Sequence, residues 1–430
     1  MVAHCAAHIS DTVRYGTCII AFDHRSSSRV MCKPQLAVGV PSGSGIAHAR
    51  RRAAIRASWL KFDEFRSGIA VGVFVVRCAA NETASSALRA EAARHPNDTL
   101  CSPLGQGCSS NACRTRGVVL ALIYWLRHTL TALPSVRWIA KADDDVFINI
   151  PRIIAYLDAI PTAIAPWAFF GTPGFFSTLE NETMLIPRGY APSYQFALKV
   201  ARRYALRRQC GELTRSRSCR IVGPFPYMCG QFFALGAGIV RAVVLQRTDL
   251  GEEERRIARL PDSNPLVTED VWLGSLLFRF LDARGQPPRA SNRANAQLST
   301  TAGERSAWLR RPQLALFSLE GQRGLWLDPT HAKADKLRVP STLIVYHNRL
   351  RVHRWMTRLY DFATVLQRCA TPLRWQPRWP YAIEGAGSRG VWDPGWTVYS
   401  LVPSGASRPL ELDTACIPST VDLLDPQNHN

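Results

Sequence analysis

The sequence predicts an α/β fold in which a mixed, mostly parallel β-sheet is flanked by helices on both faces. Short apolar runs bounded by Pro, Gly or polar turns alternate along the chain with segments of helical periodicity. Such alternation is typical of βαβ units, whose crossover helices cover the sheet. The chain has 430 residues, of which 47% are hydrophobic, so it can form one large domain or two.

The first βα unit is expected to begin with a strand over residues 35–41. Pro41 and a Ser-Gly-Ser-Gly turn end this strand, because Pro and Gly interrupt a regular ladder. A basic amphipathic helix is expected over residues 47–62, where Ile55 and Trp59 share one face.

The later elements follow the same alternation. Strands are expected over 69–76, 136–140, 167–171 and 343–347, and helices over 83–94, 116–130, 152–160 and 266–281. Residues 224–235 contain Pro, Gly and aromatic residues, which suggests a substrate-cleft loop.

The domain organisation follows from shifts in composition. We expect a poorly specified leader remnant over residues 1–34 and a main domain over 35–369. Within the main domain, residues 282–311 are rich in Arg, Ala, Ser and Gly and predict a mobile basic insertion. Residues 370–430 form a Trp-, Pro- and Gly-rich extension without clear periodicity.

The chain is strongly basic, with 53 Lys and Arg against 33 Asp and Glu and a formal net charge of +20. This favours an anionic partner, such as a nucleotide, a phosphorylated glycan, a nucleic acid or a membrane surface. A genome that prefers Arg codons explains the charge equally well. The basic residues show no recognition-helix pattern, so we expect no nucleic-acid partner.

Cysteines and sequons favour an oxidising lumen. The twelve Cys residues have no zinc spacing, and Cys210 with Cys219 is one candidate disulfide. Three glycosylation sequons begin at Asn81, Asn97 and Asn181.

No apolar run approaches about 18 residues, so we expect no transmembrane helix here. The expectation is then a cytosolic protein, or a reading frame whose start is truncated or misassigned.

Three consecutive carboxylates, Asp143, Asp144 and Asp145, follow the strand over 136–140. Packed together they repel one another unless a cation lies among them, and Mg²⁺ or Mn²⁺ prefers carboxylates with phosphate oxygens. The pattern suggests a metal–diphosphate site at the carboxyl edge of the sheet. Solvated turn residues that cap the next helix are the alternative.

Further residues could belong to such a site. Glu269 and Asp270 either satisfy the first turn of a helix or provide a general base. His347, at the end of an apolar strand, is either a hydrogen-bonded structural residue or a metal ligand. Arg52 and Arg56 form either a solvated basic face or a diphosphate clamp.

Four segments in order resemble the β-1,3-glycosyltransferases related to β-1,3-galactosyltransferases. They are Arg52-x-x-Ile55-Arg56-x-x-Trp59, Lys141-x-Asp143-Asp144-Asp145-Val146-Phe147-x-Asn149, Tyr227-x-Cys229-Gly230 and Glu269-Asp270-Val271-x-x-Gly274. The resemblance spans about residues 35–370. Gly39-Val40-Pro41-Ser42 and Val345-Tyr346-His347 are most similar to the trypanosomatid phosphoglycan β-1,3-galactosyltransferase branch.

The resemblance implies a GT-A, Rossmann-like fold that binds a UDP-sugar with Mn²⁺ or Mg²⁺. It implies inverting transfer of galactose from UDP-galactose in β-1,3 linkage to a glycan or an anionic phosphoglycan. By position, it assigns Asp145, Asp143 and His347 to the metal, Asp270 with Glu269 to catalysis, and Arg52, Arg56, Lys141, Asp143 and Asp144 to the nucleotide. It also implies a lumenal catalytic domain at the Golgi membrane, although the family's signal anchor is missing here.

Two alternatives stay open at this stage. A transferase of the same fold could use UDP-GlcNAc, because the motifs report on UDP and metal rather than on the sugar. A degenerate paralogue could bind glycan or polyanion without catalysis. Gln231-Phe232-Phe233 stands where the family has Gly and Tyr, and we interpret these larger side chains as narrowing the cleft.

Overall fold

The computed structural model describes most of the predicted main domain. The described residues are 33–77, 82–96, 98–102, 114–179, 221–244, 250–260 and 268–285, with the shorter segments 13–15, 18–20, 199, 203, 314–318, 326–327, 345–347, 356–361, 363–364, 375–381 and 396–403. The predictions for the three sequons, for Cys210 with Cys219 and for 286–311 lie outside these residues.

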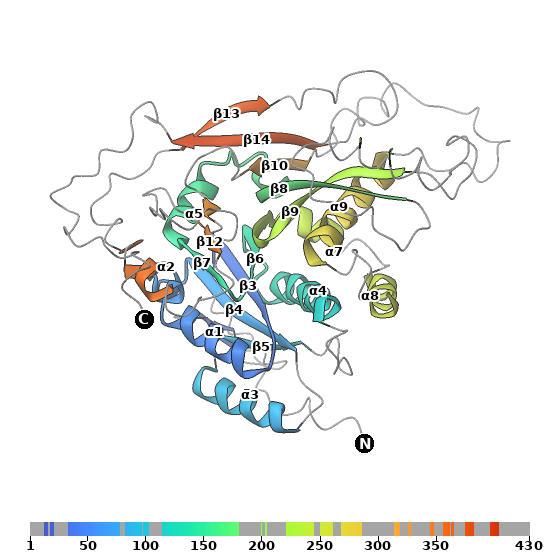
Figure 1. Cartoon of the computed structure of the whole chain (residues 1–430). Coiled ribbons are helices and arrows are strands. Elements are labelled where there is room, and N and C mark those ends of the chain that lie inside the picture. Colours follow the sequence, from blue (N-terminus) through green and yellow to red (C-terminus); the bar gives the residue numbers. More distant parts are fainter. Residues whose placement is uncertain are drawn as a thin grey trace, which may run out of the picture.

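Among the described residues, the main sheet has nine strands in the order β13-β14-β10-β8-β9-β6-β3-β4-β5, and Figure 1 shows their arrangement. Their bounds are β3 Leu36–Ser42, β4 Ala70–Arg77, β5 Thr99–Ser102, β6 Trp138–Ala142, β8 Ala168–Leu179, β9 Ile221–Gly236, β10 Leu314–Ser318, β13 Trp375–Tyr381 and β14 Trp396–Pro403. Neighbouring strands are parallel except at β13–β14, β8–β9 and β6–β9. The predicted Rossmann-like α/β fold with a mixed, mostly parallel sheet is confirmed.

The parallel part of the sheet contains a topological switch point. From β3 the chain moves outward to β4 and β5, and then returns to place β6 on the other side of β3. In open α/β sheets, ligands bind in the crevice at the carboxyl ends of the strands where the order reverses. This crevice lies at Ser42, which ends β3, and at Ala142, which ends β6.

Helices cover both faces of the sheet (Figure 1). Their bounds are α1 Ile46–Arg56, α2 Asp63–Arg66, α3 Glu82–Arg94, α4 Arg114–Ala132, α5 Ile150–Asp158, α7 Ala237–Val244, α8 Leu250–Arg259 and α9 Glu269–Gly285, with 3-10 turns η1 Trp59–Lys61 and η3 Ala165–Trp167. α1 and α5 enclose one core with one face of the sheet, and α4, α7 and α9 enclose the other.

The alternation of strand side chains explains this arrangement. Leu36, Val38 and Val40 point into the core under α1 and α5, whereas Ala37 points toward α4. A side chain at Gly39 would lie 2.5 Å from the Trp125 indole, so the glycine allows α4 to approach the sheet. Strand β3 is therefore buried along its whole length, with helices packed over both of its faces.

The helix predicted over 47–62 is shorter in the structure. α1 ends at Arg56, and η1 follows. The Ser58 hydroxyl donates to the Ala54 carbonyl oxygen at 2.7 Å, a local bond that competes with helix continuation. Trp59 and Phe62 are buried in the same core as Ile55, as their shared face predicted.

The prediction of a substrate-cleft loop over 224–235 is wrong, because these residues belong to the long strand β9, Ile221–Gly236. Strand β8 likewise continues to Leu179, beyond the predicted end at residue 171. β9 pairs with β6 only through its last residues, whereas Pro226 pairs with β8 alone. Proline is tolerated where one edge of a strand makes no ladder bonds, which explains why Pro did not end this strand.

The described residues also form two smaller sheets. β11 Trp326–Leu327, β12 Val345–His347 and β7 Val146–Ile148 form a separate three-stranded sheet, and β1 Val13–Tyr15 pairs with β2 Cys18–Ile20. In the C-terminal extension, the unpredicted strands β13 and β14 join the edge of the main sheet. No helix among the described residues is long and apolar enough to cross a membrane.

Candidate functional site

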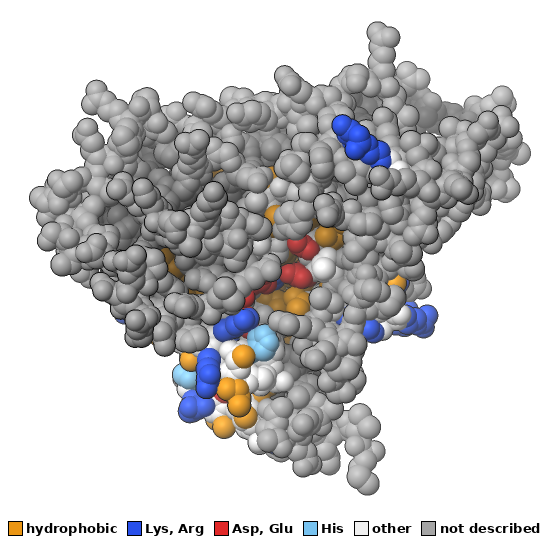
Figure 2. All heavy atoms as spheres, in the orientation of Figure 1, with side chains coloured by type: hydrophobic (Ala, Val, Ile, Leu, Met, Phe, Trp, Pro, Cys, Tyr) orange, Lys and Arg blue, Asp and Glu red, His pale blue; other side chains and the backbone are white. Residues whose placement is uncertain are grey.

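The candidate site lies at the switch point, where the acidic loop (residues 143–145) leaves β6. The Asp143 amide donates to the Gln231 carbonyl oxygen at 3.0 Å, which fixes the start of the loop against β9. Figure 2 shows acidic side chains near the centre of one face, with basic and histidine side chains directly beside them. The contacts of the loop are with charged and polar side chains, which include Lys141, His48 and Arg51.

A fully buried lysine holds the acidic loop to α9. Lys141 has no exposed side-chain surface, and its Nζ donates to Asp143 Oδ1, to Glu269 Oε1 at 2.7 Å and to the Gly230 carbonyl oxygen. A buried ammonium needs such partners, because loss of hydration is otherwise unfavourable. Lys141 thus joins the ends of β6 and α9, and the structure brings together predicted residues from two motifs.

Burial and neighbouring charges shift the pKa values of Lys141 and Asp143 in this cluster. Burial lowers the pKa of Lys141, but the charges of Asp143 and Glu269 outweigh it and raise that pKa above its ordinary value. Burial raises the pKa of Asp143 to about 6; Lys141 opposes this shift, whereas Glu269 and Asp145 add to it. The cluster holds more carboxylates than one lysine can neutralise.

Asp270 is the carboxylate of this cluster whose pKa changes most. Burial and the neighbouring Glu269 charge raise the pKa of Asp270 to about 7. The Val271 amide donates to Asp270 Oδ1 at 2.7 Å and fixes this side chain at the start of α9. A carboxylate with this pKa can accept and release a proton near neutral pH, as a general base must.

Two glycines explain why the cluster can assemble. A side chain at Gly230 would lie 2.6 Å from Glu269 Oε1, so this position must stay open for the contact with Lys141. A side chain at Gly274 would lie 2.6 Å from the Pro226 carbonyl oxygen. The glycine therefore allows α9 to pack directly on β9, and this packing places Glu269 and Asp270.

Asp144 faces α1 rather than Lys141. Its carboxylate accepts hydrogen bonds from Ser42 Oγ at 2.8 Å and from Arg51 Nη1 at 2.8 Å, and it lies 2.5 Å from His48 Nδ1. Burial raises the pKa of Asp144, but the contacts with His48, Arg51 and Ser42 outweigh it and lower that pKa. Asp144 is thus an ionised centre that ties the acidic loop to β3 and α1.

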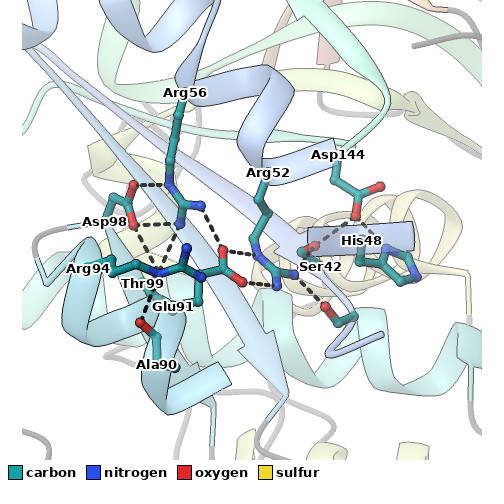
Figure 3. Close-up of polar contacts among 11 residues, drawn as sticks. Ser42, His48, Arg52, Arg56, Ala90, Glu91, Arg94, Asp98, Thr99 and Asp144 are labelled. Atoms are coloured by element: carbon teal, nitrogen blue, oxygen red, sulfur yellow. Dashed lines mark hydrogen bonds and ion pairs between the residues drawn. The ribbon is translucent and has the colours of Figure 1, made fainter. Parts of the chain in front are cut away.

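Arg52 and Arg56 are engaged with carboxylates on and beyond α3 (Figure 3). Arg52 donates through Nε and Nη2 to both Glu91 oxygens, at 2.8 and 2.6 Å, and through Nη1 to Ser42 Oγ at 3.0 Å. Arg56 donates to Glu91 and to both Asp98 oxygens. These contacts stabilise the turn after β3, and a role at the nucleotide stays a prediction for both arginines.

The proposed metal ligands are only partly described. Asp145 Oδ2 lies 3.6 Å from Arg51 Nη1. In the pairing of β12 with β7, His347 stands opposite Val146, the residue that follows Asp145 in the sequence. Among the described side chains, which do not include that of His347, no three His, Cys, Asp or Glu residues form a metal site. Asp143 and Asp145 carry the carboxylate oxygens that a hard divalent cation prefers, and a role at a metal stays a prediction for these residues and for His347.

The interpretation that Gln231-Phe232-Phe233 narrows the cleft is wrong for its two phenylalanines. Phe232 packs in the core under α1 and α5, in contact with Phe170, and Phe233 packs in the opposite core against Phe169. Neither phenylalanine exposes more than 1% of its surface. They stabilise the two cores, because successive residues of a strand point to opposite faces.

Sequence reasoning missed three residues that contact the site. His48 and Arg51 bind Asp144, and Glu91 neutralises Arg52 and Arg56. His48 and Arg51 lie three residues apart on one helix, a spacing that places them on the same face. That spacing, together with their position directly after a strand and a Gly-rich turn, is the signal that could have identified them.

Comparisons with known proteins add little to this description. No protein-family model and no curated protein matches the chain. The apo form of mouse xyloside xylosyltransferase 1 is similar with a TM-score of 0.29 and 10% identity, over 74% of this chain and 98% of that chain. Mannose-1-phosphate geranyltransferase from Thermus thermophilus is similar with a TM-score of 0.24 and 14% identity, over 56% of this chain and 68% of that chain. Likenesses at these TM-scores carry no argument, so the assignment of an activity rests on this chain's own residues.

Proposed function

We propose that this protein is a nucleotide-sugar-dependent glycosyltransferase of the GT-A type that inverts the anomeric centre. The observation that carries the proposal is Asp270, a carboxylate with a pKa of about 7 in a cluster with Lys141 and the acidic loop. The cluster lies at the switch point of a Rossmann-like sheet, which is the place where such folds bind nucleotides. The four segments that resemble β-1,3-glycosyltransferases support the same activity.

Asp270 is the general base of the proposed reaction. Its carboxylate accepts the proton of an acceptor hydroxyl while the hydroxyl oxygen forms a bond to the anomeric carbon of the sugar. The bond from that carbon to the diphosphate oxygen breaks, and UDP leaves with the electron pair. Lys141 holds Glu269 beside the base through a 2.7 Å contact and lowers the pKa of Asp270, which keeps a larger fraction of the base ionised.

Asp143, Asp145 and His347 are the residues that would hold a divalent cation such as Mn²⁺ or Mg²⁺. Such a cation supplies positive charge that neutralises the departing diphosphate. Burial and, after it, the charges of Glu269 and Asp145 raise the pKa of Asp143, and a bound cation would offset the repulsion among these carboxylates.

The finer assignment rests on the resemblance. We propose UDP-galactose as the donor, a β-1,3 linkage, and a glycan or phosphoglycan acceptor whose negative charge suits the net charge of +20. We also propose a lumenal location at the Golgi membrane. Cys101 is disulfide-bonded, which supports an oxidising compartment.

A donor panel tests this function. Purified protein is incubated with UDP-galactose, UDP-GlcNAc or UDP-glucose, an oligosaccharide or phosphoglycan acceptor, and Mn²⁺ or a chelator, and the released UDP is measured. Turnover with UDP-galactose and Mn²⁺ is expected, and its loss in Asp145→Ala would support the metal assignment. Turnover with UDP-GlcNAc and with no other donor would replace UDP-galactose by UDP-GlcNAc as the assigned donor. Salt-sensitive binding of polyanions without any UDP release would instead indicate a non-catalytic binding protein.

A further inference from the structure

An arginine and a histidine side chain of α1 lie side by side at the acidic loop. Arg51 Nη1 lies 2.8 Å from Asp144 Oδ1, and His48 Nδ1 lies 2.5 Å from Asp144 Oδ2. The side chain of Arg51 is 25% exposed and that of His48 is 31% exposed, whereas Asp144 is only 6% exposed. The buried carboxylate therefore holds two partly exposed groups at the surface of the crevice.

The position of this pair is well defined. The His48 ring lies over Gly43, where an added Cβ would be 2.5 Å from the ring carbon Cδ2. Ser42 Oγ donates to the same Asp144 oxygen that faces His48 (Figure 3). A side chain whose ring packs on backbone and whose Nδ1 is bound loses little freedom when a ligand binds.

The pair differs from the neighbouring Arg52 in the nitrogen donors that remain for a ligand. Arg52 is 1% exposed and uses Nε and both Nη nitrogens for Glu91, Ser42 and Gly43. Among the described residues, Arg51 contacts its partners through Nη1 alone, which leaves Nε and Nη2 for a ligand. His48 likewise contacts Asp144 through Nδ1, which leaves Nε2.

We infer that Arg51, with His48 beside it, binds the phosphate oxygens of the nucleotide donor. This inference rests on the proposed function and gives to Arg51 and His48 the phosphate contact that the sequence predicted for Arg52 and Arg56. A guanidinium fork matches the spacing of phosphate oxygens and binds them through two parallel hydrogen bonds. Asp144 is then a positioning residue, since it orients both groups and contacts no phosphate itself.

The test compares the affinity for UDP with that for uridine, which has no phosphate. UDP binding is measured by calorimetry and uridine binding by ligand-observed NMR, on the full chain with Mn²⁺. Arg51→Ala should bind UDP roughly 10- to 100-fold more weakly, because a hydrogen bond between charged groups is lost, and uridine affinity should stay unchanged. Arg51→Lys keeps a charge next to Asp144 and should show a smaller loss of UDP affinity.

Arg50→Ala is the matched control, because Arg50 is exposed on the same helix and the variant loses the same charge. Its UDP affinity should equal that of the unaltered chain. Gly43→Ala, which displaces the His48 ring, should weaken UDP binding without removing any charge. The inference would be overturned by unchanged UDP affinity in both Arg51 variants, or by a loss of UDP affinity in Arg50→Ala as large as that in Arg51→Ala. Either result would leave the proposed function standing. If the unaltered chain binds no UDP, the proposed function fails and the inference fails with it.

Discussion

Replacing Glu91 with Gln should lower the free energy of unfolding by about 3 kcal/mol at neutral pH. Burial raises the pKa of Glu91, but Arg52 and Arg56 outweigh it and lower that pKa from 4.5 to about 2. A difference of one pKa unit corresponds to about 1.4 kcal/mol, which gives the magnitude above. Loss of one partner of a buried ion pair costs roughly 3–5 kcal/mol in other proteins, because the remaining charge stays unpaired.

Denaturant unfolding of the two proteins checks this prediction. The midpoint should fall in Glu91→Gln with an unchanged slope. Because the pKa of Glu91 is lower in the folded state, its contribution is present above pH 4.5 and is lost as pH falls toward 2. The difference between the two proteins should therefore shrink over that range. Asp63→Asn removes an exposed pair with Arg66 and serves as the control, with little change expected. Equal stability of Glu91→Gln and the unaltered chain at pH 7 would refute the reasoning.

Three further predictions concern the cluster around Asp270. Gly274→Ala should destabilise the protein by about 1–3 kcal/mol in thermal or denaturant unfolding, because the new methyl group meets the Pro226 carbonyl oxygen; unchanged stability would show that α9 can shift. The pH dependence of kcat/KM should rise through a limb near pH 7, since the pKa of Asp270 is about 7 and the base must be ionised; a limb near pH 4 would exclude Asp270 as that base. Lys141→Met should move the limb to higher pH, because the lysine charge lowers the pKa of Asp270, and a shift to lower pH would contradict this.

The strands that form the switch point could be predicted from sequence to within two residues. β3, β4 and β6 are buried apolar runs bounded by turns, so local composition identifies them. β9 could not be predicted in this way, because its Pro and Gly residues suggest a loop. Only the pairing with β8, which depends on residues about 50 positions away, makes a strand with Pro residues stable.

The site could be predicted from sequence only where its residues have a local signal. Acidic residues at the end of a strand and at the start of a helix are visible locally, and the structure joins them through Lys141. The contacts of Arg52 with Glu91 have no local signal, because the two residues lie 39 positions apart on different helices. The sequence therefore identified the charged residues more reliably than it identified their partners.

The rate of UDP release by Asp270→Asn, compared with the unaltered chain, tests the central claim most directly. The comparison uses UDP-galactose, Mn²⁺ and a glycan acceptor, and UDP affinity is measured in parallel. Removal of a general base should lower the rate by roughly 10²- to 10⁴-fold while UDP affinity is retained, because Asp270 acts on the acceptor hydroxyl. A variant that releases UDP as fast as the unaltered chain would contradict the assignment of Asp270 as the base.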